Sequence, residues 1–379
     1  MKKTLTLFFA IILLYGYEAF SVETSAKQAI LVEVSSGDII FEKNKDQKIS
    51  PASLTKIMTS IIAFDLIKKG EIKLDEKFIV SNKAWRMSKQ GYSSMFIMPN
   101  DRISVENLLR GIIVASGNDA CVTLAEGIAG SETTFASMMN DKAKIIGMAH
   151  TNFSNASGIF SENNYSTVND IALMSVYLIK NFPELYRMYS EKKFTWDRTG
   201  GNPISQPNRN TLLNKNKFID GIKTGHLSDS GYSLAASIKV NNRRVLSVLS
   251  GTKSSRERSK ESLKLLNYAL IATDLLQIKK DNPLFVADVW NSKGKITKLK
   301  LEKDYFITYP KRRSRDVKFS IVINEPIKIK FKKNDPLGLL KIEGRNGFKK
   351  EYPLLASEDF KEVNFIKKFF NSINFLIWG

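Results

Sequence analysis

Residues 51–60 of this chain read PASLTKIMTS. Apolar residues recur at helical spacing after Pro51, and Gly70 stands where the end of a helix is expected. The pattern predicts an amphipathic helix with the apolar positions Leu54, Ile57, Met58, Ile61, Ile62 and Leu66. Because residues three apart share one face of a helix, the Lys56 amine can reach the Ser53 oxygen.

A serine and a lysine in this arrangement are typical of a nucleophile and its base. A serine hydroxyl is a poor nucleophile until a base removes its proton, and a desolvated lysine can be that base. To act near neutral pH, the lysine pKa must fall from about 10.4 to about 7–8, at a differential cost of roughly 4 kcal/mol. Burial and a second cation both lower such a pKa. The N-terminus of the helix would also direct N–H groups at a developing oxyanion.

Two further motifs make the serine–lysine pair specific. Ser-x-x-Lys alone is a weak signal because it recurs in this lysine-rich chain, at Ser190, Ser250 and Ser292. Ser116-Gly117-Asn118 is equally weak alone, since Ser-x-Asn also occurs at Ser161 and Ser372. Lys223-Thr224-Gly225 occurs once. In order, the three motifs lie at a helix start, an interhelical break and a strand, and together they form a specific set.

The first region, residues 22–280, is predicted to be α+β. A hairpin is expected from residues 28–34 and 39–41, helices from 104–114, 119–128, 133–146 and 168–179, strands from 219–224, 232–240 and 244–249, and a last helix from 256–276. Strands from both ends of a helical middle would then form one sheet.

The composition changes near Asp281-Asn282-Pro283, and residues 281–356 are predicted to be a small all-β domain. Strand-like alternation covers residues 295–301, 317–323 and 327–331, with turn signals between them.

Residues 357–379 are predicted to hold an amphipathic helix, from Glu358 to Trp378. Its apolar face comprises Val363, Phe365, Ile366, Phe369, Phe370, Ile373, Leu376 and Ile377. Two interpretations remain open: a helix docked on the β domain, and a helix lying on a membrane surface without spanning it. The aromatic bulk, the terminal position and the flanking lysines favour the membrane.

The N-terminus predicts where the protein is located, and the composition limits the partners and the kinds of site it can have. Lys2 and Lys3, an apolar run and Ala19-Phe20-Ser21 predict a signal peptide over residues 1–21, although a short buried helix or an uncleaved anchor remains an alternative. The net charge of +20 suits acidic partners, but export argues against nucleic acid. One cysteine excludes an intramolecular disulfide, and two histidines do not suggest a metal centre, so we expect neither metal nor other cofactor.

On these motifs the chain resembles the serine-type D-Ala-D-Ala carboxypeptidases, the low-molecular-mass penicillin-binding proteins of the penicillin-binding protein 5/6 type. The matching blocks are residues 51–60, 109–111 with 115–120, and 220–226, and the likeness extends over essentially the whole chain. The resemblance implies a penicillin-binding/β-lactamase-like transpeptidase domain, with a helical cluster and an antiparallel sheet, followed by the β domain and the terminal helix. It also implies removal of the terminal D-Ala from peptidoglycan stem pentapeptides, covalent inhibition by β-lactams, and a peripheral place on the periplasmic side of the cytoplasmic membrane.

The resemblance also implies residue roles. Ser53 would attack the carbonyl of the penultimate D-Ala, Lys56 would take its proton, and Ser116 would relay a proton to the leaving amine. Substrate contacts would come from Asn118, Lys223, Thr224, Gly225 and His226, with backbone N–H groups of Ser53 and His226 forming the oxyanion hole. Lys223 would also lower the pKa of Lys56. Further candidates to bind the carboxylate are Arg209 and Arg258, for which a solvated surface charge is the alternative.

Two rival functions remain open at this level. A β-lactamase would share the motifs, but the Glu-x-x-Leu-Asn segment of class A enzymes is absent from the sequence. A penicillin sensor or scaffold that acylates without turnover is the other. One departure from the family pattern, Leu227 in place of a frequent Thr, concerns the rim of the site.

Overall fold

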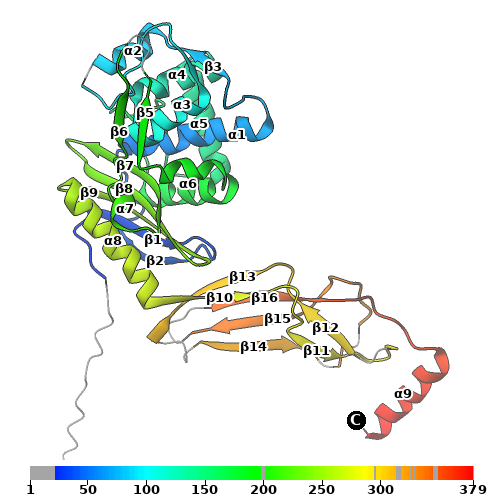
Figure 1. Cartoon of the computed structure of the whole chain (residues 1–379). Helices are drawn as coiled ribbons and strands as arrows, with labels where there is room; N and C mark the ends of the chain where they lie inside the picture. Colours follow the sequence, from blue (N-terminus) through cyan, green and yellow to red (C-terminus); the bar gives the residue numbers. More distant parts are fainter. Residues whose placement is uncertain are drawn as a thin grey trace, which may run out of the picture.

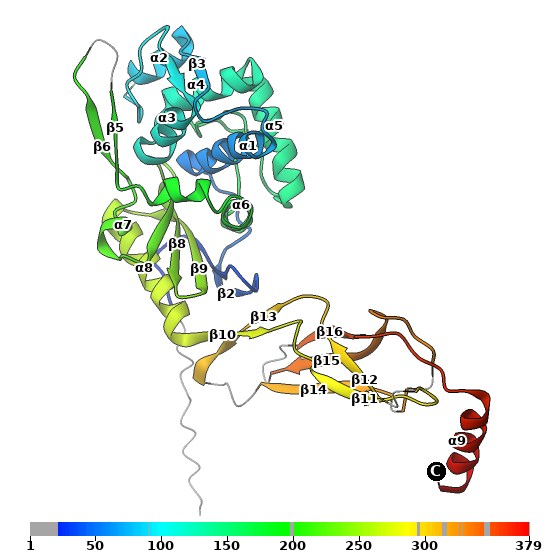
Figure 2. The same cartoon turned by 45° about the vertical axis from the view of Figure 1, so that its right-hand side comes forward.

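The computed structural model describes residues 22–89, 91–197, 201–293, 296–312, 317–324, 326–327, 329–344 and 349–378. A helical cluster and a sheet form one end of the molecule, a β-rich region follows, and a single helix forms the other end (Figure 1). The same sequence of parts is seen after a 45° turn (Figure 2). The expected signal peptide at residues 1–21 lies outside the described residues.

The main sheet takes strands from both ends of the first region, as predicted. It has five antiparallel strands in the order β2-β1-β9-β8-β7. Their bounds are β1 Gln28–Glu33, β2 Ile39–Lys43, β7 Ile219–Leu227, β8 Gly231–Val240 and β9 Arg243–Thr252. The expected hairpin of β1 and β2 is confirmed.

The helical middle of the chain covers one face of this sheet, except for the short helix α7 (Leu212–Lys215), whose Leu212 and Leu213 belong to the core on the other face. Its helices and helical turns are η1 Ala52–Thr55, α1 Lys56–Lys69, α2 Asn82–Lys89, α3 Val105–Arg110, η2 Gly111–Ala115, α4 Asn118–Ala129, α5 Glu132–Ile146, α6 Val168–Asn181, η3 Leu185–Ser190 and α7 Leu212–Lys215. Two antiparallel strand pairs belong to this region, β3 Lys77–Ile79 with β4 Arg102–Ser104 and β5 Lys193–Trp196 with β6 Ile204–Pro207. The side chains of Ser131 and Thr167 accept N–H bonds at the starts of α5 and α6.

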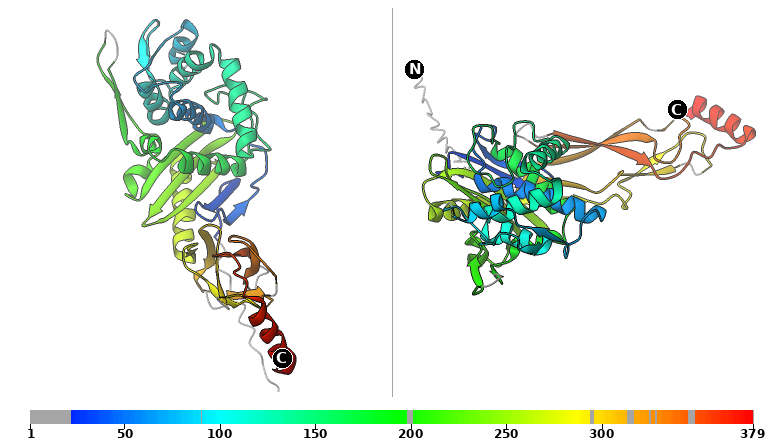
Figure 3. Two further views of the ribbon diagram at one scale, coloured as in Figure 1. Left: turned by 90° about the vertical axis from the view of Figure 1, so that its right-hand side faces the viewer. Right: turned by 90° about the horizontal axis from the view of Figure 1, so that it is seen from above.

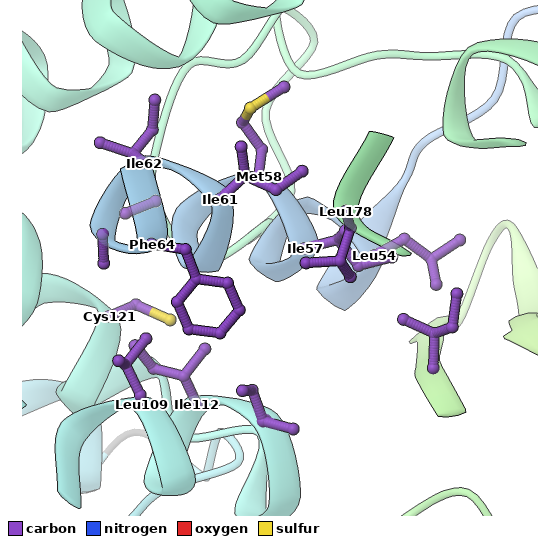
Figure 4. Close-up of a cluster of buried hydrophobic side chains, with 14 of the residues drawn as sticks. Leu54, Ile57, Met58, Ile61, Ile62, Phe64, Leu109, Ile112, Cys121 and Leu178 are labelled. Carbon is purple, nitrogen blue, oxygen red and sulfur yellow. The ribbon is translucent and has the colours of Figure 1, made fainter. Parts of the chain in front are cut away.

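Helix α1 lies in the centre of the cluster, and the prediction that it is amphipathic is wrong. Its first nine residues, Lys56 to Phe64, are all buried. Phe64 packs toward Cys121, Leu109 and Ile112 (Figure 4), while Ile57 lies near Leu178. A helix enclosed by neighbours on every side carries no polar stripe. Gly70 ends it with φ 76°, as expected.

Helix α8 (Ser255–Ala272) packs on the opposite face of the sheet and ends earlier than predicted. Leu265, Leu266 and Ala269 meet the apolar residues of β8 and β9 in a second core. The expected helix to Leu276 is wrong in its last turn, because Thr273–Ile278 forms strand β10, which pairs with β13 (Tyr305–Pro310). Leucines at these positions suit a half-buried strand as well as a helix.

The β-rich region has a small core of its own. Its second sheet has the order β11-β12-β16-β15-β14, with β11 Phe285–Asp288, β12 Ile296–Lys300, β14 Lys318–Ile323, β15 Pro336–Glu343 and β16 Lys349–Ala356. The core includes Leu299, Ile307, Ile342 and Leu354. The strand expected over residues 327–331 is wrong: among the residues described there, Ile327 forms an isolated bridge with Val289.

Polar contacts join the β-rich region to the hairpin of the first region. The Asp38 carboxylate accepts from Lys350 Nζ at 2.6 Å and from the Thr308 N–H at 3.1 Å. Ser36 Oγ lies 2.8 Å from Thr308 Oγ1. These contacts lie at the turn between β1 and β2, away from the helical cluster.

The terminal helix α9 (Phe365–Trp378) begins later than predicted. The segment before it is extended along the β-rich region: Val363 N–H donates to Asn291 O, and Lys293 N–H donates to Lys361 O. Val363, expected on the free apolar face, is therefore buried at 6% exposure. Figure 3 shows α9 at the end of the molecule farthest from the helical cluster. Among the described residues, no helix has the length and apolar character needed to cross a membrane.

Candidate active site

Ser53 and Lys56 lie at the junction of η1 and α1, as the motif predicts. Lys56 Nζ is 3.0 Å from Ser53 Oγ. Ser53 is half-buried, whereas Lys56 is only 1% exposed. Gly158 permits this packing, because a Cβ there would lie 1.8 Å from Ala52 O. The nucleophile candidate is thus held at the edge of the protein interior, and its base candidate lies inside.

The other partners of Lys56 are two oxygen acceptors, which can bind either the ammonium or the neutral amine. Its Nζ donates to Asn118 Oδ1 at 2.7 Å and to the Ser157 carbonyl at 2.6 Å. A neutral amine has two N–H groups, which these two oxygens take, and one lone pair, which is then left for the Ser53 hydroxyl. Burial lowers the pKa of Lys56, and the positive charge of Arg209 lowers it further, against the opposing effect of Asp119. This arrangement can accept a proton from Ser53.

Ser116 lies in the break between two helices. After the π-helical turn η2, Ser116 adopts a left-handed conformation with φ 62°. It is 3% exposed, and Lys223 Nζ donates to its Oγ at 3.0 Å. Asn118 begins α4 directly afterwards, so the two polar residues of this motif contact the two lysines of the site.

Lys223 lies on β7, the edge strand of the main sheet, and is 2% exposed. Burial lowers the pKa of Lys223 well below its ordinary value, and the positive charges of Lys56 and Arg209 lower it further. Because charge repulsion between two amines is mutual, a protonated Lys223 would also disfavour protonation of Lys56. Lys223 is not among the groups that shift the pKa of Lys56, so the expected effect of Lys223 on Lys56 stays a prediction.

The rest of the β7 motif lines the junction with η1. A Cβ on Gly225 would lie 3.1 Å from Pro51 O, so this glycine allows β7 to approach the start of η1. Thr224 is 7% exposed. His226 is exposed and stacks on Tyr232, with ring centroids 4.0 Å apart.

The two arginine candidates differ in environment. Arg209 is exposed, and its charge lowers the pKa of both Lys56 and Lys223. Arg258 is 5% exposed, and its Nη1 donates to Gly225 O at 3.2 Å and to Ser233 O at 3.4 Å. Burial lowers the pKa of Arg258 to about 10. The surface-charge alternative therefore does not apply to Arg258.

Two polar groups of the site region were not predicted from the sequence. The first is the Ser157 carbonyl that accepts from Lys56; Asn155 Oδ1 shapes its loop by accepting from Ser157 N–H and Gly158 N–H. The second is the Asp119 carboxylate. It is fully buried and accepts from hydroxyl and backbone donors, which include Ser88, Ser94, Met95 and Phe96. An Asx turn at Asn155 and the Asp after the Ser116 motif were the available signals.

Within the described part of the chain, no group of three or more His, Cys, Asp or Glu residues is placed to hold a metal ion. Cys121 is buried beneath the site, and burial raises the pKa of its thiol to about 12.

With this geometry in view, comparison with known families gives a clear result. Residues 17–254 match the family model of D-alanyl-D-alanine carboxypeptidase, peptidase family S11. The chain belongs to this family. Residues 276–362 match the penicillin-binding protein 5 C-terminal domain.

Individual relatives agree with the family assignment. D-alanyl-D-alanine carboxypeptidase DacC of Escherichia coli is 35% identical, covering 94% of this chain and 91% of the relative. DacA of Haemophilus influenzae is 37% identical over 78% of this chain and 75% of its own length. The crystal structure of penicillin binding protein 5 from Haemophilus influenzae matches with a TM-score of 0.81 at 33% identity, over 90% of this chain and 99% of that one. The predicted family, the mixed helix and sheet fold with its all-β C-terminal domain, and the carboxypeptidase class are confirmed.

Proposed function

We propose that the chain is an exported serine carboxypeptidase that removes the terminal D-Ala from peptidoglycan stem pentapeptides through an acyl-enzyme on Ser53. One observation carries this proposal: Lys56 Nζ donates to Asn118 Oδ1 and to the Ser157 carbonyl, and it lies 3.0 Å from Ser53 Oγ. A buried lysine with this set of partners is suited to be a general base.

Acylation would proceed as follows. Ser53 Oγ bonds to the carbonyl carbon of the penultimate D-Ala while its proton passes to Lys56 Nζ. Backbone N–H groups of Ser53 and His226 stabilise the oxyanion; losing one such donor typically costs about 2.7–4 kcal/mol. The C–N bond then breaks, and D-Ala leaves as an amine with a proton relayed through Ser116. Water later attacks the ester and releases the shortened peptide.

The terminal carboxylate of the substrate would be bound by positive charge at the end of β7. Lys223 and Thr224 are proposed to face it, Asn118 to hold the substrate amide, and Gly225 to keep the strand close to η1. Arg209 is exposed, and its charge acts on both lysines of the site, so it is proposed as a further contact to the carboxylate. Since its Nη1 is taken by the Gly225 and Ser233 carbonyls, Arg258 would act on the carboxylate through its charge.

The same acylation step accounts for inhibition by β-lactams, and relatives of this chain carry the name penicillin-binding protein. A sensor that acylates without turnover and a β-lactamase would also be labelled by penicillin. Turnover of a D-Ala-D-Ala peptide separates the enzyme from the sensor, and hydrolysis of nitrocefin separates it from a β-lactamase.

We further propose that α9 lies on the periplasmic surface of the cytoplasmic membrane after removal of residues 1–21. Its described apolar side chains are strongly exposed: Phe365 84%, Ile366 66%, Phe369 58% and Phe370 61%. Lys367 and Lys368 are exposed between them. Each lysine near an anionic surface contributes about 1 kcal/mol. The alternative of a helix docked through its apolar face is not supported by these exposures.

The function is tested by measuring D-Ala release from diacetyl-Lys-D-Ala-D-Ala by residues 22–379, with Ser53→Ala as the control. The proposal expects release by the wild type and none by the variant. Stable penicillin labelling without D-Ala release would instead support the sensor, and release that survives Ser53→Ala would place the nucleophile elsewhere. Removing residues 365–379, which leaves the extended segment on the β-rich region intact, should release the protein from membranes without loss of this activity.

A further inference from the structure

Strand β7 contains a bulge shortly before Lys223. Ile219 pairs with Ile238 of β8, and Gly221 pairs with the preceding residue, Ser237. Asp220 is therefore the extra residue and has no partner on β8. A bulge changes the direction of the side chains that follow it, and bulges are common next to active sites.

The Asp220 carboxylate is held by groups from other elements. Arg244 of β9 forms a two-point ion pair with it, with Nη1–Oδ1 at 2.8 Å and Nη2–Oδ2 at 2.6 Å. The same Nη1 donates to Ser237 Oγ of β8 at 2.6 Å. The Tyr186 hydroxyl of η3 donates to Asp220 Oδ1 at 3.1 Å, and the guanidinium lies over the Tyr186 ring. Asp220 is thus bonded directly to β9 and η3, and Arg244 connects it to β8.

The position of the bulge decides which way Lys223 points. Lys223 pairs with Ala235, so it lies on the same face of the sheet as Ser237. Because side chains alternate along a strand, a shift of one residue would turn Lys223 to the opposite face, toward α8. Its contact with Ser116 Oγ at 3.0 Å would then be lost.

We propose that Asp220 is a positioning residue: its ion pair with Arg244 and its hydrogen bond from Tyr186 fix the bulge, and the bulge places Lys223 against Ser116. The inference rests on the proposed function and deepens it, because Lys223 and Ser116 act in that reaction. Asp220 does not touch the substrate in this account.

The chain provides a matched control on the adjacent residue. Arg243 Nε donates to Glu33 Oε2 at 2.7 Å, and its Nη1 and Nη2 donate to Thr273. Neighbouring strand residues face opposite sides, so this pair lies on the α8 face and away from Ser116. Glu33→Gln and Asp220→Asn each remove the carboxylate charge from an ion pair with an arginine of β9, and only the pair of Asp220 lies at the bulge of β7.

The experiment measures acylation of residues 22–379 by a fluorescent penicillin at several concentrations, together with thermal denaturation. Asp220→Asn should lower the limiting rate constant about 10- to 100-fold, as expected for a misplaced group, while the end point stays at one label per chain. Glu33→Gln should lower the melting temperature but keep the rate constant within about two-fold. Asp220→Glu, which retains the carboxylate, should recover part of the rate.

Two further variants keep the inference testable if Asp220→Asn folds poorly. Tyr186→Phe removes one hydroxyl and should slow acylation several-fold at full end point. The double variant Asp220→Asn with Arg244→Gln should acylate no more slowly than the slower single variant, because both changes remove the same ion pair. Unimpaired acylation in Asp220→Asn or Tyr186→Phe, or a lower end point at wild-type rate, would overturn the inference. A wild type that takes no label would instead contradict the proposed function itself.

Discussion

The catalytic end of the molecule buries polar side chains, whereas the α9 end exposes apolar ones. At the catalytic end, Lys56, Ser116 and Lys223 are each at most 3% exposed. At the other end, four apolar side chains of α9 are 58% to 84% exposed. Burying a lysine and exposing a large apolar side chain both cost free energy. Each feature therefore indicates a function and not a contribution to stability.

The difference shows what each end requires. Burial lowers the pKa of a lysine and so favours the neutral amine, which is the form that accepts a proton; the catalytic end therefore needs enclosure. The proposed attachment of α9 to a lipid surface needs free apolar area, so this proposal requires exposure at the other end. Four changes, from the largest expected effect to the smallest, test this division of tasks.

Lys56→Arg should have the largest effect and should break the catalytic end. Arginine keeps the positive charge but does not give up its proton, so acylation by penicillin should fall about 10³-fold. Lys142→Arg is the matched control, because Lys142 forms an ion pair with Asp65 on α1 without contacting Ser53. Stopped-flow labelling measures both. Equal rates for Lys56→Arg and the wild type would exclude Lys56 as the base.

Phe365→Glu with Phe369→Glu should break the α9 end. Each buried phenylalanine contributes about 1.5–3 kcal/mol, so binding to anionic vesicles should weaken by about 100-fold or more. Phe319→Glu, at a residue of β14 that is 50% exposed, is the control and should leave binding unchanged. Vesicle sedimentation distinguishes them. Undiminished binding of the α9 variant would show that the membrane contact lies elsewhere.

The pH dependence of acylation sharpens the account of the catalytic end. Burial lowers the pKa of Lys56, and only its neutral form can accept the Ser53 proton. Below that lowered pKa the rate should rise about ten-fold per pH unit, and above it the rate should level off. The measurement is the limiting acylation rate between about pH 5 and 9. A rate that falls as the pH rises through this range would contradict a lysine base.

Lys350→Ala should have the smallest effect, since it acts between the two ends. Lys350 Nζ lies 2.6 Å from Asp38 and both side chains are partly exposed, so about 0.5–1 kcal/mol of unfolding free energy should be lost. Thermal denaturation measures this, with the more exposed Lys349→Ala as control. Acylation and vesicle binding should not change. A change in acylation rate would mean that the β-rich region influences the site.

The residues predicted for the centre of the site stand at element boundaries, which short motifs can mark; their roles stay predictions. Ser53, Lys56, Ser116 and Lys223 were identified from three short motifs, and the structure brings them within hydrogen-bond distance in pairs. The hairpin of β1 and β2, and the sheet with strands from both ends of the first region, followed from alternation and turn residues.

What was missed depends on contacts that no local pattern contains. The Ser157 carbonyl is a backbone group, so its role for Lys56 leaves no mark on residue type. Asp220 of β7 and Arg244 of β9 meet across β8, and the bulge at Asp220 has no sequence signal of its own. The end of α8 at Ala272 and the late start of α9 were decided by strand pairing and by Asn291, against a continuing apolar pattern.

The most direct test of the central claim is to locate the covalent bond to a β-lactam. Residues 22–379 are incubated with penicillin, digested, and examined by mass spectrometry of the peptides that contain Ser53 and Ser116. The account predicts the added penicilloyl mass on Ser53 alone, and no adduct in Lys56→Arg at the same time point. An adduct on Ser116 or on any residue other than Ser53 would contradict it.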